Sequence, residues 1–182
     1  MTTKMADALW PAVFIDRDGT TMEDTDYCCD PKDVRILPGV IEALRSLKSR
    51  GFKLIIITNQ SGIGRGLFTV DQYRAVESEV LRQLGEGLLD ATYYCPHAPG
   101  QHSKFRKPAP GMVIEAARDH QIDLSRSFLI GDKEVDVECA HNAGVRAIRV
   151  RTGIQYDVTG SNADWLANDV PAAVQIILNA KS

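Results

Sequence analysis

Long apolar segments are absent from this sequence of 182 residues. No stretch approaches the roughly 20 apolar residues that a bilayer-spanning helix needs, and residues 1–11 lack an apolar run long enough for a secretory signal. We therefore expect a cytoplasmic protein without membrane contact. Cysteine is also scarce, since the chain has only Cys28, Cys29, Cys95 and Cys139. That number and spacing fit a reducing compartment and do not resemble a disulfide scaffold.

An excess of basic residues is missing too. The chain carries 21 lysines and arginines against 24 aspartates and glutamates, which gives a formal net charge of −3. Nucleic-acid binding relies on a basic face that displaces counterions, so this composition argues against a nucleic-acid partner. The apolar content of 44% and the charged content of 25% are ordinary for a globular protein. Residues 1–182 contain no linker, internal repeat or low-complexity segment, which predicts a single domain.

Short apolar runs alternate with helical patterns along nearly the whole chain. The expected strands are 12–15, 53–58, 91–94, 127–131 and 146–150, and the expected helices are 38–51, 69–85, 110–120, 132–144 and 169–180. Thr69 and Gln72 have the spacing of a capping box, whereas Asp132 and Gly144 have the residue types of an N-cap and a C-cap. The alternation predicts a Rossmann-like α/β domain of three layers with a central parallel sheet.

Polar residues follow four of the expected strands, at the point where each strand ends. Asp16 and Asp18 follow the first strand, in "FIDRDGT". The others are Thr58 and Asn59 after the second strand, Lys107 in the loop after the third, and Asp132 after the fourth. In open parallel sheets, ligands bind outside the carboxyl ends of the strands. These residues therefore predict one site at one edge of the sheet.

The residue types at this edge define a chemistry. Three carboxylates without a histidine suit Mg²⁺, which prefers oxygen ligands, and such a cation would offset the repulsion between Asp16 and Asp18. Thr58, Asn59 and Lys107 offer hydrogen-bond donors and positive charge to phosphoryl oxygens. We expect Gly62, Gly64 and Gly66 to add unobstructed backbone N–H groups.

The stretches "DRDGT" and "TNQSG", a lysine before a proline, and "GDKEVD", in this order, resemble the motifs of the haloacid dehalogenase (HAD) superfamily of phosphohydrolases. The resemblance implies that Asp16 is a nucleophile that forms an aspartyl-phosphate, and that Asp18 is the general acid and base. It also implies that Thr58 and Lys107 stabilise the phosphoryl group. The implied magnesium ligands are Asp16, the backbone carbonyl of Asp18, and Asp132. Intervals of about 40 and 50 residues between the motifs leave no room for a cap domain, so we expect a HAD-like fold without one.

Within this superfamily, residues 13–153 look like the family of D-glycero-D-manno-heptose 1,7-bisphosphate phosphatases and histidinol-phosphate phosphatases. The stretches "TNQSGIGRGLFT", "YYCPHAP" and "RKPAPGM" carry this resemblance. It implies that Asp24, Tyr27 and Arg106 contact the substrate. An arginine can hold a second phosphate in a bidentate grip, which fits a sugar bisphosphate.

The chain departs from that family at its zinc loop. Cys95 and His97 match the first ligand pair, but "GQHSKFRK" has no cysteine at the second. His102 could be a third ligand, but no fourth follows, and structural zinc needs four. We therefore do not expect bound zinc and regard Cys95 and His97 as a partial site. The roles of Asp136 and Arg65 stay open, as solvated residues or as contacts of the site.

The sequence thus favours a monomeric Mg²⁺-dependent phosphomonoesterase for a phosphorylated small molecule, releasing the 7-phosphate of the heptose bisphosphate. Histidinol phosphate is an alternative substrate that a negatively charged pocket would favour. A 3′-phosphatase for nucleic-acid ends shares a loop like "TNQSGIGRG", but the acidic net charge speaks against it. A non-catalytic phosphate-binding protein would have no need for both Asp16 and Asp18.

Overall fold

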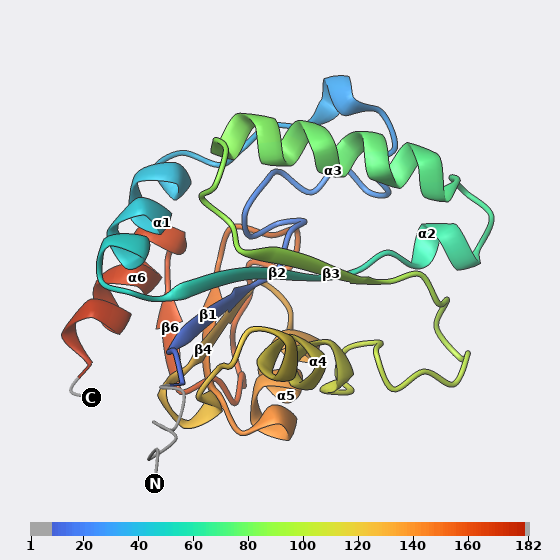
Figure 1. Ribbon diagram of the computed structural model, residues 1–182. Coiled ribbons are helices and arrows are strands. Elements are labelled where there is room, and N and C mark those ends of the chain that lie inside the picture. Colours follow the sequence, from blue (N-terminus) through green and yellow to red (C-terminus); the bar gives the residue numbers. More distant parts are fainter. Residues whose placement is uncertain (1–8, 181–182) are drawn as a thin grey trace, which may run out of the picture.

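A sheet of six parallel strands forms the centre of the protein. The computed structural model describes residues 9–180 (Figure 1). The strands are β1 (Ala12–Ile15), β2 (Lys53–Asn59), β3 (Ala91–Cys95), β4 (Phe128–Gly131), β5 (Arg146–Val150) and β6 (Trp165–Ala167). Their order in the sheet is β3-β2-β1-β4-β5-β6, and every pairing is parallel. The five expected strands are confirmed within one residue at each end. The strand β6 was missed because three residues are too few to establish a pattern.

Helices cover both faces of this sheet (Figure 1). They are α1 (Val40–Ser49), α2 (Ser61–Gly64), α3 (Val70–Leu84), α4 (Gly111–Asp119), α5 (Glu134–Ala143) and α6 (Val170–Asn179), with short 3₁₀ helices η1 (Pro31–Asp33) and η2 (Leu124–Arg126). The helices α1, α3 and α6 pack on one face, and α4 and α5 pack on the other. The prediction of a three-layer α/β fold is therefore confirmed, and residues 9–180 contain no cap domain.

Alternation along the strands fills the two cores. In β1, Val13 and Ile15 belong to the core beneath α1, α3 and α6, whereas Ala12 and Phe14 belong to the core beneath α4 and α5. All four residues are buried because the strand is covered on both sides, which explains its continuously apolar sequence.

Helix ends match the sequence signals with one exception. The capping box at α3 is confirmed, with Gln72 N–H donating to the Thr69 hydroxyl and Thr69 N–H donating to the Gln72 side chain. Gly144 ends α5 in the left-handed region, as expected. The prediction that Asp132 caps α5 is wrong, because the N-cap residue is Lys133. The Lys133 N–H donates to the carboxylate of Asp136 instead, at 3.1 Å, which leaves Asp132 free to face the sheet edge.

The strand order reverses between β1 and β4. From β1 the chain proceeds outward through β2 to β3, whereas from β4 it proceeds outward in the opposite direction to β5 and β6. The loops that follow β1 and β4 therefore diverge and leave a crevice at the carboxyl ends of these strands, which is where such folds bind ligands. Asp16 and Asp132 are the first residues beyond these two strand ends.

None of the helices within residues 9–180 combines the length and the apolar character that a bilayer span requires. Most of the N-terminal stretch 1–11, in which we expect no secretory signal, lies outside the described residues.

We expect the core on the α1 face to dominate stability. Leu44 of α1 is fully buried, so Leu44→Ala should lower the free energy of unfolding by about 2–5 kcal/mol through lost contacts and a residual cavity. Leu81 of α3 is 41% exposed, so the matched Leu81→Ala should change it by about 0.5 kcal/mol or less. Urea unfolding followed by circular dichroism measures both, and equal losses would contradict the packing described.

Candidate active site

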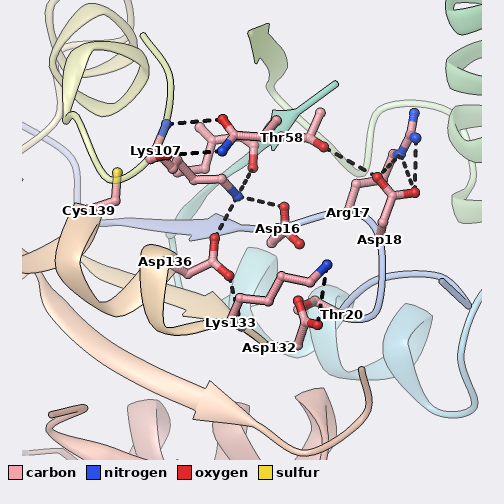
Figure 2. Close-up of polar contacts among 12 residues, drawn as sticks. Asp16, Arg17, Asp18, Thr20, Thr58, Lys107, Asp132, Lys133, Asp136 and Cys139 are labelled. Atoms are coloured by element: carbon pink, nitrogen blue, oxygen red, sulfur yellow. Dashed lines mark hydrogen bonds and ion pairs between the residues drawn. The ribbon is translucent and has the colours of Figure 1, made fainter. Parts of the chain in front are cut away.

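The centre of the site is a lysine between two carboxylates (Figure 2). The Nζ of Lys107 lies 2.6 Å from an oxygen of Asp16 and 2.6 Å from an oxygen of Asp136, and it donates to the carbonyl of Ile57 at 3.0 Å. All three charged side chains are buried. The structure thus brings together Asp16 and Lys107, which are 91 residues apart in the sequence.

Asp132 lies at the same edge in a narrow space. The Thr20 hydroxyl donates to its Oδ1 at 3.4 Å, while its Oδ2 has no hydrogen-bond partner and lies 3.7 Å from the Nζ of Lys133. A Cβ atom added at Gly153 would collide with this oxygen, and one added at Gly19 would lie 2.7 Å from it. Glycine at both positions therefore allows the backbone to close around Asp132.

Three carboxylates at this edge could hold a metal ion. Asp16, Asp132 and Asp136 each offer an oxygen, and these atoms lie within 4.8 Å of one another. Asp16 and Asp132 belong to the expected set, whose third ligand is the backbone carbonyl of Asp18, and Asp136 is an addition that the sequence left open. Both oxygens of Asp136 already have partners in Lys107 and the Lys133 N–H. Asp16, which has one such contact, and Asp132, whose Oδ2 has no hydrogen-bond partner, are therefore the more available ligands of the three.

Burial makes these charges costly. Desolvation, followed by the neighbouring charge of Asp16, raises the pKa of Asp132 to about 8. Burial also raises the pKa of Asp16, and the attraction to Lys107 offsets that shift only in part. The unpartnered Oδ2 of Asp132 and these raised pKa values are what a divalent cation with oxygen ligands would relieve, so the residues fit such an ion.

The carboxylate of Asp18 is held by Arg17 and Gln60. Arg17 donates to it through Nε, at 3.1 Å, and through Nη2, at 2.9 Å, while Gln60 donates to its other oxygen at 2.8 Å. The Thr58 hydroxyl lies at 3.5 Å from Asp18, the limit of a hydrogen bond, and accepts from Gln60 at 2.8 Å. Sequence reasoning missed Arg17 and Gln60, although both belong to the quoted motifs.

Asn59 faces the Lys107 loop. Its side-chain oxygen accepts from the Lys107 N–H at 3.0 Å, and its side-chain nitrogen donates to the Lys107 carbonyl at 3.1 Å. The predicted substrate contact would have to compete with this pair of bonds. The geometry assigns Asn59 to positioning the loop that delivers Lys107.

A cavity of about 340 Å³ opens above these groups. Its walls include the predicted residues Asp16, Asp18, Asp24, Tyr27, Thr58, Asn59, Arg106 and Lys107. Lys133, which sequence reasoning missed, also lines it and donates to Asp24 at 3.1 Å. Burial lowers the pKa of Lys133, but the carboxylates of Asp132, Asp16 and Asp24 outweigh that effect and raise it, so the side chain brings a positive charge.

The Cys95 loop borders the cavity through Arg106. The sulfur of Cys95 lies 3.5 Å from Nδ1 of His97 and 3.7 Å from the Ser103 hydroxyl, while His102 is exposed. Arg106 donates to the His97 carbonyl at 2.9 Å. The loop is thus held by hydrogen bonds, and it orients an arginine beside the cavity.

The glycine-rich stretch after β2 differs from the expectation. Residues 61–64 form the helix α2, in which Gly64 N–H donates to the Pro96 carbonyl and Gly66 N–H to the Ile63 carbonyl. The prediction that Gly64 and Gly66 offer free N–H groups is therefore wrong. Arg65 is exposed, with its guanidinium carbon 5.9 Å from the centre of the Tyr27 ring.

A parallel sheet with carboxylates and a buried lysine at its switch point matches the HAD class of hydrolases. Residues 104–174 match the family model described as HAD-hydrolase-like. The chain is 39% identical over 179 residues to a D-glycero-beta-D-manno-heptose-1,7-bisphosphate 7-phosphatase from Yersinia pestis, covering 91% of this chain and 95% of that protein. It is 40% identical to the protein of that name from Escherichia coli strain K12, covering 91% and 94%.

A solved structure supports the same family as these relatives. The D,D-heptose 1,7-bisphosphate phosphatase from B. bronchiseptica, complexed with magnesium and phosphate, superposes with a TM-score of 0.81 at 30% identity, covering 92% of this chain and 98% of that one. The chain belongs to the family of heptose 1,7-bisphosphate 7-phosphatases, within the HAD-like hydrolases.

Asn59→Ala tests the positioning of Lys107. Loss of both bonds to the Lys107 main chain should lower kcat/KM for phosphate release from p-nitrophenyl phosphate about tenfold to a hundredfold, since small displacements of reacting groups are costly. Asn142→Ala is the matched control, because Asn142 donates to the Pro108 carbonyl at 3.0 Å from the exposed side of the same loop. Equal activity of the two variants would contradict this role of Asn59.

Proposed function

We propose that this protein is a Mg²⁺-dependent phosphomonoesterase that removes the 7-phosphate of D-glycero-D-manno-heptose 1,7-bisphosphate through an aspartyl-phosphate. The observation that carries the chemistry is the buried Asp16 carboxylate, held by Lys107 at the base of a cavity whose wall also contains Asp18. Relatives of about 40% identity carry the substrate assignment. The proposed setting is a monomer in the cytoplasm.

In the proposed reaction, an oxygen of Asp16 attacks the phosphorus and the bond to the sugar oxygen breaks. Asp18 gives a proton to that oxygen, then accepts one from the water that cleaves the aspartyl-phosphate, which restores both side chains. Lys107 supplies a fixed positive charge beside the transferring group. A Mg²⁺ ion held by Asp16, Asp132 and the backbone carbonyl of Asp18 would, when bound, neutralise charge on the nucleophile and the phosphoryl oxygens.

The charges in the cavity wall support a bisphosphate substrate. Arg106 uses one nitrogen on the His97 carbonyl, which fixes the guanidinium and leaves its other donors for a second phosphate. Lys133 adds a positive charge on the same wall. An ammonium substrate such as histidinol phosphate receives less support, because the carboxylate of Asp24 is already paired with Lys133.

A phosphate-release assay with Mg²⁺ tests the substrate. The panel contains the heptose bisphosphate, histidinol phosphate, simple sugar phosphates and a 3′-phosphorylated oligonucleotide, and we expect the highest kcat/KM for the heptose bisphosphate. Asp16→Asn should lower turnover by at least about a thousandfold, because it removes the nucleophile. The control is Asp71→Asn at a side chain that is 93% exposed, which should act like wild type. Preference for another substrate would refute the assignment, and turnover retained in Asp16→Asn would refute the chemistry.

The raised pKa of Asp132 predicts that stabilisation by Mg²⁺ depends on pH. Because the folded-state value of about 8 exceeds the ordinary 3.8, stability from this group is present below pH 3.8 and is lost as the pH rises through 8. A cation needs the ionised carboxylate and relieves its cost. Protein stripped with a chelator should therefore gain about 5 °C in Tm from saturating Mg²⁺ at pH 8 and much less at pH 5.5.

Differential scanning calorimetry measures this effect, with NaCl of equal ionic strength as the control. The idea fails if the gain in Tm at pH 5.5 equals or exceeds the gain at pH 8.

A further inference from the structure

Arg17 is an arginine within the protein interior. Only 2% of its surface is exposed, and its sole ion pair within residues 9–180 is with the next residue, Asp18. Burying an arginine is costly unless its charge is paired and its donors are used. The burial of Arg17 therefore indicates a role other than the small stabilisation that a surface ion pair gives.

The guanidinium of Arg17 is fixed from two sides. Its central carbon lies 5.5 Å from the centre of the Tyr73 ring of α3, a cation–π distance. On the other side, Nε and Nη2 both reach Oδ1 of Asp18, and Nε also lies 3.2 Å from Oδ2. Although burial lowers the pKa of Arg17, the charge of Asp18 outweighs that effect and raises it, which is consistent with a permanent cation here.

Asp18 is thereby held in one orientation. Arg17 donates to both oxygens, Gln60 donates to Oδ2, and the side chain of Asp18 keeps 20% of its surface exposed and lines the cavity. Every close partner that these contacts provide is a donor, so both oxygens of Asp18 accept hydrogen bonds in this orientation. An acceptor with a fixed direction at the cavity wall suits the step in which water must lose a proton.

Building on the proposed function, we propose that Arg17 is a positioning residue that orients the Asp18 carboxylate for hydrolysis of the aspartyl-phosphate. In this step the water oxygen bonds to phosphorus and the bond from phosphorus to the Asp16 oxygen breaks. The water proton passes to Asp18, and inorganic phosphate leaves. Arg17 exchanges no proton in this step.

A substrate whose leaving group needs no proton distinguishes the hydrolysis of the aspartyl-phosphate from its formation. With p-nitrophenyl phosphate, nitrophenolate departs unaided, so the formation of the aspartyl-phosphate does not require Asp18. Stopped-flow absorbance then gives two rate constants, one for the first turnover and one for the steady state. For Arg17→Met we expect the ratio of the first to the second to rise at least about tenfold above the wild-type ratio, because only hydrolysis is impaired.

The chain contains a matched control pair. Arg118 and Asp119 are also adjacent, and Arg118 Nε and Nη2 reach Asp119 Oδ1 at 3.0 and 2.9 Å, but this arginine is 73% exposed on α4. Arg118→Met should leave both rate constants unchanged. Acid-quenched Arg17→Met should also carry more phosphorylated protein in the steady state than the wild type does.

A merely structural role for Arg17 predicts a different outcome. Loss of folded protein would lower the amplitude of the first turnover and the steady-state rate by the same factor, so both rate constants per active site, normalised to that amplitude, and their ratio would equal those of the wild type, which would overturn the proposal. If Arg17→Met does not fold by circular dichroism, Arg17→Lys provides the same test, since it keeps the charge and loses the planar fork.

A double-mutant cycle adds a second criterion. In Asp18→Asn the group that Arg17 positions is gone, so adding Arg17→Met should change the steady-state rate constant less than about twofold. Full additivity would overturn the proposal. Failure of the proposed function is recognised separately, because Asp16→Asn would then retain turnover and the wild type would accumulate no phosphorylated protein.

Discussion

The ion pairs of Lys107 are the constraint on which the rest of the site depends. Burial lowers the pKa of this lysine, but the charges of Asp136 and Asp16 outweigh it and raise the pKa, so the ammonium stays charged in the interior. Removing charges from water is costly, and the short contacts with two carboxylates offset that cost only because the geometry is close. Lys107 and Lys133 do not balance three carboxylates, because Lys133 also pairs with Asp24. The excess negative charge lies at Asp16 and Asp132, which is where a cation would complete the site.

Small side chains make this crowding possible. A Cβ atom at Gly131 would collide with Asp136, and Gly19 and Gly153 enclose Asp132 in the same way. The surrounding loops are fixed by buried polar groups: Arg149 donates to the Asp132 carbonyl at 3.1 Å, and Thr152 donates to the Gly19 carbonyl at 2.7 Å. Each contact joins the end of one strand to the loop of another. The backbone around the charged groups is therefore held in place by these side-chain hydrogen bonds.

The sequence predicts the site residues that follow the carboxyl ends of the strands. Asp16, Lys107 and Asp132 could be predicted to meet because parallel strands place their carboxyl ends at one edge. The partners of Asp18 could not be predicted in this way. Whether Arg17 points to solvent or into the protein depends on Tyr73, which lies 56 residues further along the chain, and on the packing of α3. The bonds of Asn59 and Lys133 are likewise long-range, and local patterns carry no signal for them.

The residues proposed for catalysis and those proposed for substrate recognition lie on different kinds of structural element. Asp16, Thr58 and Asp132 lie in or directly after strands, and Lys107 is buried in the loop that follows β3, whereas Asp24, Tyr27 and Arg106 lie on loops that line the cavity. The backbone at Asp26 and Tyr27 adopts positive φ angles of 52° and 66°, which non-glycine residues rarely do. A Cβ atom at Gly62 would lie 2.8 Å from the Tyr27 ring, so close packing on α2 holds that loop in its conformation. A change in these loops would therefore alter which phosphate ester fits the cavity while the contacts of Lys107 stay as they are.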